Sequence, residues 1–186
     1  IGMTNHKFTQ LCDFEDVSAK NLIQKLQKQG QSDTQILNLL NRVSRDHSRT
    51  PMQWNHDKLA GFSEQSSWII VNPNSAQINV EAQKQDPDSV LSFYKKLIGL
   101  RKQHLSLITG RYALLLANDP QIYAYQRITE TETWTIITNL SAETAEVDNT
   151  SFNNLGELVL TNIKDAKPQL ESQLAPYAAY VFHVKH

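Results

Sequence analysis

The residues best suited to chemistry lie in the segment Ser44–Trp54, where two arginines stand four positions apart. Arg45 and Arg49 flank an Asp-His-Ser turn, and Pro51 follows at once. A guanidinium presents a rigid fork of N–H donors, which can meet a carboxylate and a hydroxyl together. Pro51 lacks an N–H donor and pushes Thr50 away from helix, so the segment is predicted to be an irregular loop. Such a loop is typical of a ligand-facing surface.

Other residue types suggest chemistry that their spacing does not support. The run Asp46-His47-Ser48 holds the three residue types of a serine-hydrolase triad, but a triad brings them from separate segments in a set geometry. Arg45 and Asp46 are instead expected to form a local ion pair that shapes the loop and contributes about 0–1 kcal/mol. The six histidines show no metal-ligand spacing, and His183-x-x-His186 lies at a terminus that is expected to fray. We therefore predict no metal ion and no cofactor.

Helical periodicity marks the part of the chain that must position this loop. Apolar residues at helical spacing predict helices over residues 17–29 and 33–43, the second capped by Ser32 or Asp33. A third helix is predicted after Asp86 as N-cap, with an apolar stripe on one face. Residues 44–85 are rich in Pro, Gly, Asn and Ser and are predicted to be loop. The stripe consists of Val90, Phe93, Tyr94, Leu97 and Leu100.

The pattern changes after Gly110 to short segments rich in β-branched and aromatic residues. Strands are predicted over 112–116, 122–127, 133–138, 157–160 and 179–184, with turns at 117–120 and 129–132. Strands at this spacing favour an antiparallel sheet or sandwich. The predicted fold class is therefore α+β, with one domain over residues 1–105 and a second over 106–186.

Composition excludes several classes of protein. The 186 residues carry a formal net charge of −1 and 40% hydrophobic residues, which describes an ordinary globular protein. No basic excess points to nucleic acid, and no apolar run is long enough to span a membrane. The single cysteine, Cys12, cannot form an internal disulfide and fits a reducing compartment, so we expect a cytoplasmic location.

The loop motif also resembles a known family. The run Arg45-Asp46-His47-Ser48-Arg49-Thr50-Pro51-Met52-Gln53-Trp54 is similar to the signature of the α-glucosidase branch of glycoside hydrolase family 13, which includes oligo-1,6-glucosidases, dextran glucosidases and trehalose-6-phosphate hydrolases. Further segments resemble the family in order, at 1–5, 71–74, 97–102 and 174–182. The resemblance implies that residues 1–105 are the helical, loop-rich end of a (β/α)8 barrel, and that 106–186 form the antiparallel β-sandwich that follows it.

The resemblance gives Arg49 a role. The matching arginine of the family pairs with an aspartate from the first barrel loop and grips the non-reducing end of the sugar. That aspartate lies outside this chain, so Arg49 is expected to be unpaired here. Trp54 and Trp68 are expected to pack the long loop. The chain departs from the family pattern at His47, and at Glu15 where an arginine is usual. Arg49 is thus the one predicted substrate-binding residue.

The resemblance also implies what the chain lacks. Retaining glycosidases use two carboxyl groups about 5–5.5 Å apart. In the family both carboxyl groups, and a third aspartate in an Asn-His-Asp motif, come before the point where this chain begins. The tripeptide Asn55-His56-Asp57 matches that motif but follows no barrel strand, so chance identity explains it. We therefore expect a C-terminal fragment with no catalytic residue of its own, inactive without the missing N-terminal barrel.

Two functions follow as hypotheses. The first is a part of a retaining α-glucosidase that acts on short sugars, either trehalose 6-phosphate, which the Ser48 variant slightly favours, or α-1,6-linked isomalto-oligosaccharides. The alternative is a non-catalytic carbohydrate-binding or structural β-module. A row of exposed aromatic residues on one sheet face would favour binding, and Tyr123 and Tyr125 share a face by the two-residue period of a strand. The apolar stripe of the third helix predicts self-association or retention of the barrel piece.

Overall fold

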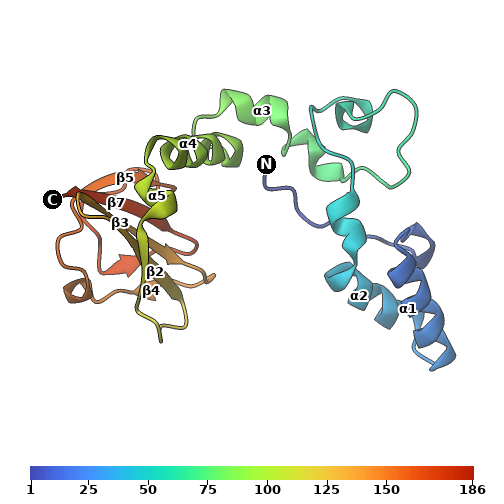
Figure 1. Cartoon of the computed structure of the whole chain (residues 1–186). Coiled ribbons are helices and arrows are strands. Elements are labelled where there is room, and N and C mark those ends of the chain that lie inside the picture. Colours follow the sequence, from blue (N-terminus) through green and yellow to red (C-terminus); the bar gives the residue numbers. More distant parts are fainter. The chain divides into compact units, whose positions relative to one another are not determined.

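A computed structural model describes all 186 residues as two compact units, Ile1–Ser92 and Phe93–His186 (Figure 1). The division falls inside helix α4 (Val90–Gln103). The expected domain boundary at residue 106 refers to the intact protein and stays a prediction. Each unit has its own buried core, so each is described by itself below.

The first unit is built on the two predicted helices, α1 (Val17–Lys28) and α2 (Asp33–Val43), which lie side by side (Figure 1). The Asp16 carboxylate caps α1 by accepting from the N–H groups of Ser18 and Ala19, and Ser32 forms a capping box with Gln35 on α2. The apolar faces of both helices bury a core with the preceding segment. Its members include Phe8, Phe14, Leu26, Ile36, Leu40 and Ile69.

The long segment after α2 is held in place by side-chain amides. Gln53 is fully buried and donates to the carbonyl of Ile78 at 2.6 Å and to Asn74 at 3.0 Å. Asn72 donates to the carbonyl of Thr4 at 2.9 Å, which ties the segment to the start of the chain. Three short 3-10 helices lie within it, at Arg45–Arg49, Lys58–Gly61 and Pro73–Ala76. It also contains one helix that periodicity did not predict, α3 (Val80–Gln85), capped by Asn79.

The third predicted helix, α4, begins later than expected. The Oγ atom of Ser89 accepts from the N–H of Ser92 at 3.2 Å, as a helix cap does. Asp86 instead accepts from the N–H of Asp88 at 2.9 Å and turns the chain before the helix, so its prediction as N-cap was wrong. None of the residues of α4 is buried, and Tyr94, Leu97 and Ile98 are exposed.

The second unit is an antiparallel sheet of five strands in the order β1-β2-β3-β7-β5. Its strands are β1 (Arg111–Leu115), β2 (Ile122–Ile128), β3 (Glu132–Asn139), β5 (Glu157–Thr161) and β7 (Ala179–Lys185). All five were predicted. A short ribbon of β4 (Ala145–Glu146) and β6 (Gln173–Leu174), which was not predicted, completes the unit (Figure 1). The α+β fold class is confirmed.

The two faces of the five-stranded sheet are covered differently. One face packs against the ribbon, since Ile137 and Phe182 of the sheet share a core with Ala145 and Leu174. The opposite face buries Trp134 and Val181 under Leu107 of helix α5 (Ser106–Thr109), with Leu100 of α4 beside them. The two layers account for the sandwich that the strand pattern predicts. No helix is both long and apolar enough to cross a membrane.

Candidate substrate-binding site

A buried carboxylate, that of Asp16, lies at the centre of the loop that carries the two arginines. Its side chain is 3% exposed, and Arg49 Nη1 donates to its Oδ2 atom in an ion pair. Arg45 Nη2 lies 3.1 Å from the same oxygen. The other oxygen, Oδ1, accepts from the N–H of Ser18 at 2.8 Å. The carboxylate therefore caps α1 and binds both arginines of the predicted motif.

A second carboxylate, that of Asp46, fixes the position of the first. Asp46 is fully buried, and its oxygens accept from the N–H of Asp16 at 2.9 and 3.1 Å and from the N–H of Glu15 at 3.2 Å. Ser44 Oγ lies 3.1 Å from it. Asp46 thus anchors the backbone at the start of α1. The predicted ion pair between Arg45 and Asp46 was wrong, because Arg45 reaches Asp16 instead.

The surroundings of Asp16 favour its charged form. Burial opposes ionisation of the carboxyl group, but the bond from Arg49, the N–H groups of Ser18 and Ala19, and the charge of Arg45 outweigh it. Together they lower the pKa of Asp16 to about 2. The carboxylate is therefore ionised at neutral pH, and it remains an acceptor for both guanidinium groups.

The structure gives Arg49 a partner that the sequence did not predict. Arg49 was expected to be unpaired, and that expectation was wrong because Asp16 pairs with it. Its side chain is 39% exposed, so solvent reaches part of it. A guanidinium carries five N–H donors, and the bonds to Asp16 leave others for a second acceptor. Its substrate-binding role stays a prediction. Sequence reasoning could have found Asp16 only as a helix-capping residue.

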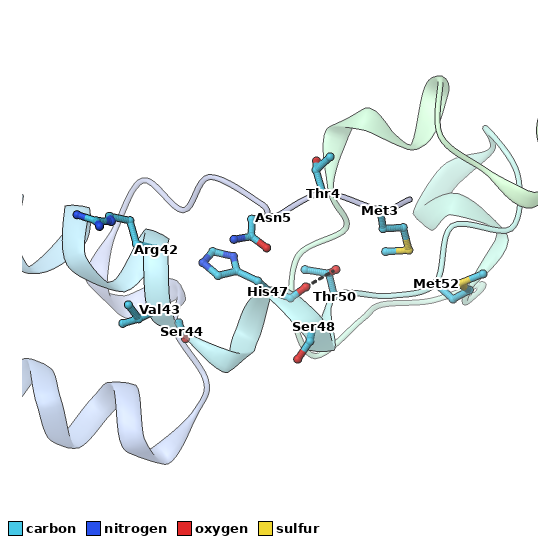
Figure 2. A pocket seen from close by; sticks show the side chains of 10 residues that line it. All are labelled: Met3, Thr4, Asn5, Arg42, Val43, Ser44, His47, Ser48, Thr50 and Met52. Atoms are coloured by element: carbon cyan, nitrogen blue, oxygen red, sulfur yellow. Dashed lines mark hydrogen bonds between the residues drawn. The ribbon is translucent and has the colours of Figure 1, made fainter. Parts of the chain in front are cut away.

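A pocket of about 600 Å³ opens beside the same 3-10 helix (Figure 2). Figure 2 shows Asn5, Arg42 and His47 on one side of it and Met3 and Met52 on the other; Thr4, Val43, Ser44, Ser48 and Thr50 complete the lining. Thr50 Oγ1 donates to the carbonyl of His47 at 3.3 Å, which closes the helix. The lining mixes amide, hydroxyl and cationic groups with thioethers, and it could accept a polar ligand of sugar size.

The imidazole of His47 is buried and lines this pocket, and that of His6 is half-buried and interacts with His47. His47 Nε2 is 3.3 Å from the carbonyl of Leu40, while the Nδ1 atoms of His47 and His6 are buried without a partner. Burial lowers the pKa of His6, and the neighbouring His47 lowers it further. The lowered pKa favours the neutral imidazole of His6. His47, the position where the chain departs from the family pattern, thus packs inward rather than contacting the arginines.

The remaining aromatic and histidine motifs of this loop are at the surface. The rings of Trp54 and Trp68 are exposed, so the expectation that they pack the loop was wrong for this structure. Asn55 and Asp57 bond to each other at 2.9 Å in a local turn, and His56 is exposed. The tripeptide 55–57 is a surface turn, as its position predicts.

A second polar cluster lies in the other unit, around Glu132. His183 Nε2 is 2.7 Å from Glu132 Oε2, and the imidazole stacks on Trp134 with ring centroids 4.0 Å apart. Ser106 donates to Glu132, and Trp134 donates to Ser106 at 3.0 Å. Since the hydroxyl donates to the carboxylate and not to the imidazole, the cluster is no triad. His186 bonds to Thr133 at 2.9 Å, so the expected fraying of this terminus was wrong.

Three tyrosines contact one another on the sheet face that carries α5. The ring centroids of Tyr112 and Tyr123 lie 5.5 and 5.4 Å from that of Tyr125, and the two outer hydroxyls are 3.2 Å apart. Tyr112 and Tyr123 are 43% and 40% exposed. The guanidinium of Arg127 lies 5.5 Å from the ring of Tyr112. Exposed rings in contact are the feature expected of a sugar-binding β-module.

Known proteins match the chain along its length. A family model described as the catalytic domain of α-amylases matches residues 1–110. The chain is 40% identical over 180 residues to the trehalose-6-phosphate hydrolase of Escherichia coli, covering 96% of the chain and 33% of that protein. It is 37% identical over 190 residues to the oligo-1,6-glucosidase of Parageobacillus thermoglucosidasius, covering 100% of the chain and 34% of that protein. The chain thus spans about a third of the length of these curated relatives.

Solved structures match as closely. The trehalose-6-phosphate hydrolase of Bacillus licheniformis superposes with a TM-score of 0.91 at 34% identity, over 100% of this chain and 34% of that one. An isomaltulose synthase from Klebsiella sp. LX3 has a TM-score of 0.88 at 33% identity, over 98% of this chain and 33% of that one.

Proposed function

We propose that this chain, which belongs to the α-amylase family of glycoside hydrolases, is part of an enzyme that hydrolyses α-glucosidic bonds of short sugars. The predicted resemblance to a C-terminal part of a family 13 enzyme is confirmed by the family match and by the partial coverage of each relative. The observation that carries the proposal is the arginine-carboxylate cluster at Asp16, in a chain that aligns from end to end with enzymes of this activity.

In this proposal Arg49 binds the sugar and the missing portion carries out the chemistry. The N–H groups of Arg49 that Asp16 does not bind meet a sugar hydroxyl and the aspartate that the resemblance implies. Bond cleavage with retention needs two carboxyl groups set about 5–5.5 Å apart. The resemblance implies that those groups belong to the portion of the relatives that this chain does not match. The chain alone is therefore proposed to be inactive.

Two substrates fit this proposal. Trehalose 6-phosphate is supported by the relative from Escherichia coli and by the solved structure from Bacillus licheniformis, and α-1,6-linked isomalto-oligosaccharides by the oligo-1,6-glucosidases. The cluster holds the carboxyl groups of Asp16 and Asp46 and the guanidinium groups of Arg45 and Arg49, two negative and two positive formal charges, although of these two carboxyl groups the arginines contact only that of Asp16. Its formal charge is zero, so it suits a neutral glucosyl ring, and a phosphate would bind elsewhere.

The test joins this chain to the portion of the Escherichia coli relative that precedes the match, and assays trehalose 6-phosphate, trehalose and isomaltose. We expect hydrolysis of trehalose 6-phosphate or of isomaltose by the joined protein and none by the chain alone. A joined protein that is folded but hydrolyses no α-glucoside would contradict the proposal. Turnover by the purified chain alone would contradict the assignment of the catalytic groups.

The tyrosines of the sheet support one alternative, a carbohydrate-binding β-module. Aromatic rings offer flat apolar surfaces, and hydroxyls at their edges can bond to sugar oxygens. Titration of the chain with an isomalto-oligosaccharide, followed by tyrosine fluorescence, measures this directly. Saturable binding that is lost in Tyr123→Ser but kept in Tyr177→Ser would favour the module, because Tyr177 is exposed outside the cluster.

The place of action is proposed to be the cytoplasm. The support is the free thiol of Cys12, which is exposed and would persist in a reducing compartment. The proposed partners are the small sugar substrate and the remainder of the catalytic domain.

A further inference from the structure

We propose that Asp16 is a positioning residue for Arg49, which sets the direction of the guanidinium that meets the sugar. That the ligand is a sugar rests on the proposed function. That Asp16 orients Arg49 does not depend on the proposed function. The local sequence does not mark Asp16 for this role. An aspartate directly before a helix is already explained as a helix cap, and Asp16 does cap α1.

The surroundings of Asp16 hold its side chain in one conformation. Its carboxylate is 3% exposed, its Oδ1 atom accepts from two N–H groups of α1, and its backbone N–H is bonded to Asp46. Each of these bonds restrains a rotation of the side chain or of the backbone that carries it. A carboxylate held in this way can orient a partner without moving itself.

Arg49 is the part of the pair that can move. It lies in a five-residue 3-10 helix at the surface, and its side chain is 39% exposed. Arginine has several rotatable bonds, so ordering it costs conformational entropy before any ligand binds. The ion pair to Asp16 orders the guanidinium in advance. A ligand then meets donors that are already ordered, which is how preorganisation raises affinity.

Arg45 completes the arrangement from the other side. It lies 3.1 Å from the same Oδ2 atom that Arg49 binds, and it also donates to Ser18 Oγ at 3.1 Å. Arg45 Nη2 donates to the other oxygen, Oδ1, at 3.4 Å, so one carboxylate binds two guanidinium groups.

The first experiment labels the arginines of the whole chain with phenylglyoxal and maps the products by mass spectrometry. Asn caps a helix as well as Asp does, so Asp16→Asn keeps α1 and removes only the charge. We expect labelling of Arg49 to rise on the order of tenfold, since a bond between charged groups contributes about that factor or more. Asp33→Asn is the matched control, because Asp33 is an exposed aspartate at the start of α2.

Arg111, an exposed arginine of β1, is the internal reference, because its labelling reports the reagent concentration and the reaction time in every sample. Unchanged labelling of Arg49 in a folded Asp16→Asn chain would overturn the proposal. Should Asp16→Asn lose the helix signal by circular dichroism, Asp16→Ser takes its place, because a serine also caps α1 but has no charge. We expect the same rise in the labelling of Arg49 in the Asp16→Ser chain, and unchanged labelling in that chain would also overturn the proposal.

The second experiment separates positioning from a merely structural role. In the joined enzyme, Asp16→Asn is measured alone and in an Arg49→Ala background. If Asp16 acts through Arg49, it lowers kcat/KM on the order of tenfold in the first case and has no further effect in the second. An equal loss in both backgrounds would overturn the proposal. If the joined enzyme hydrolyses no glucoside at all, the proposed function fails, and the labelling experiment still decides the positioning role.

Discussion

Glu132 of β3 binds Ser106, the first residue of helix α5, and so ties that helix to the sheet. Replacing Glu132 should therefore lower the stability of the second unit. The substitution is Glu132→Gln, which keeps the shape of the side chain and removes its charge. Glu132 accepts from Ser106 Oγ and from His183 Nε2 at 2.7 Å. Hydrogen bonds to a charged group contribute about 1.5–3 kcal/mol, against roughly 0.5–1.5 kcal/mol for neutral pairs.

The expected loss follows from that difference. The Glu132 side chain is largely but not fully buried, so solvent screens part of each interaction. Converting two charged bonds to neutral ones should then lower the free energy of unfolding by about 1–2 kcal/mol at pH 7. For a unit of this size that corresponds to a fall in Tm of roughly 5–10 °C. Guanidinium chloride unfolding, followed by Trp134 fluorescence, measures the change.

The stabilisation by Glu132 should depend on pH, and the direction of its pKa shift sets the sign of that dependence. The bond from Ser106 lowers the pKa of Glu132 against the opposing effect of burial, and the bonds from His183 and Trp134 lower it further. A lowered pKa means that the stabilisation is present above the unfolded value of 4.5 and is lost as the pH falls through the folded pKa. The difference between wild type and Glu132→Gln should therefore shrink below about pH 4. Glu130→Gln, in the exposed turn next to it, should change little. A difference that is absent at pH 7, or that grows in acid, would refute the reasoning.

Four further predictions follow from the same structure. Phe182→Ala should lower the free energy of unfolding, measured by chemical denaturation, by about 3–5 kcal/mol, because Phe182 is fully buried. Val159→Ala, at an exposed strand position, should change the free energy of unfolding by under about 1 kcal/mol. The first unit should lose the stabilisation by Asp16 between about pH 4 and pH 2, because its lowered pKa of about 2 makes that contribution disappear only in acid; a circular dichroism titration of Asp16→Asn should lack this step. The exposed apolar residues of α4 should cause self-association, so light scattering should detect a species heavier than 21.2 kDa, and a strict monomer would contradict this. Limited proteolysis should cut first within residues 44–85, where most of the backbone is irregular, and first cuts inside the five-stranded sheet would contradict that.

Local pattern predicted most of the elements. The helix α1 follows from apolar spacing, α2 follows from apolar spacing together with the cap at Ser32, and the five long strands follow from β-branched and aromatic runs. The helix α3 was missed because its six residues are too few to show a period. The ribbon of β4 and β6 was missed for the same reason, since two residues per strand leave no alternation to detect.

The contacts of the candidate site lay beyond what local pattern can predict. The pair between Asp16 and Arg49 joins residues 33 positions apart, and the pair between Glu132 and His183 joins residues 51 positions apart. Neither spacing has a sequence signature, because both depend on how the elements pack. The same holds for Asp46, whose adjacency to Arg45 suggested a local pair although its carboxylate in fact bonds to the backbone before α1. The motif therefore singled out the loop and made Arg49 the candidate, and the structure supplied Asp16 as its partner.

The central claim is that Arg49 meets the sugar in an α-glucosidase completed by the missing portion. It is tested most directly by kcat/KM of the joined enzyme and of its Arg49→Ala and Arg111→Ala variants on the glucoside that the joined enzyme hydrolyses. We predict a loss on the order of tenfold or more for Arg49→Ala, since it removes a charge-assisted bond to the substrate, and almost no loss for Arg111→Ala. Equal kcat/KM for the Arg49→Ala variant and the unmodified joined enzyme would contradict the account.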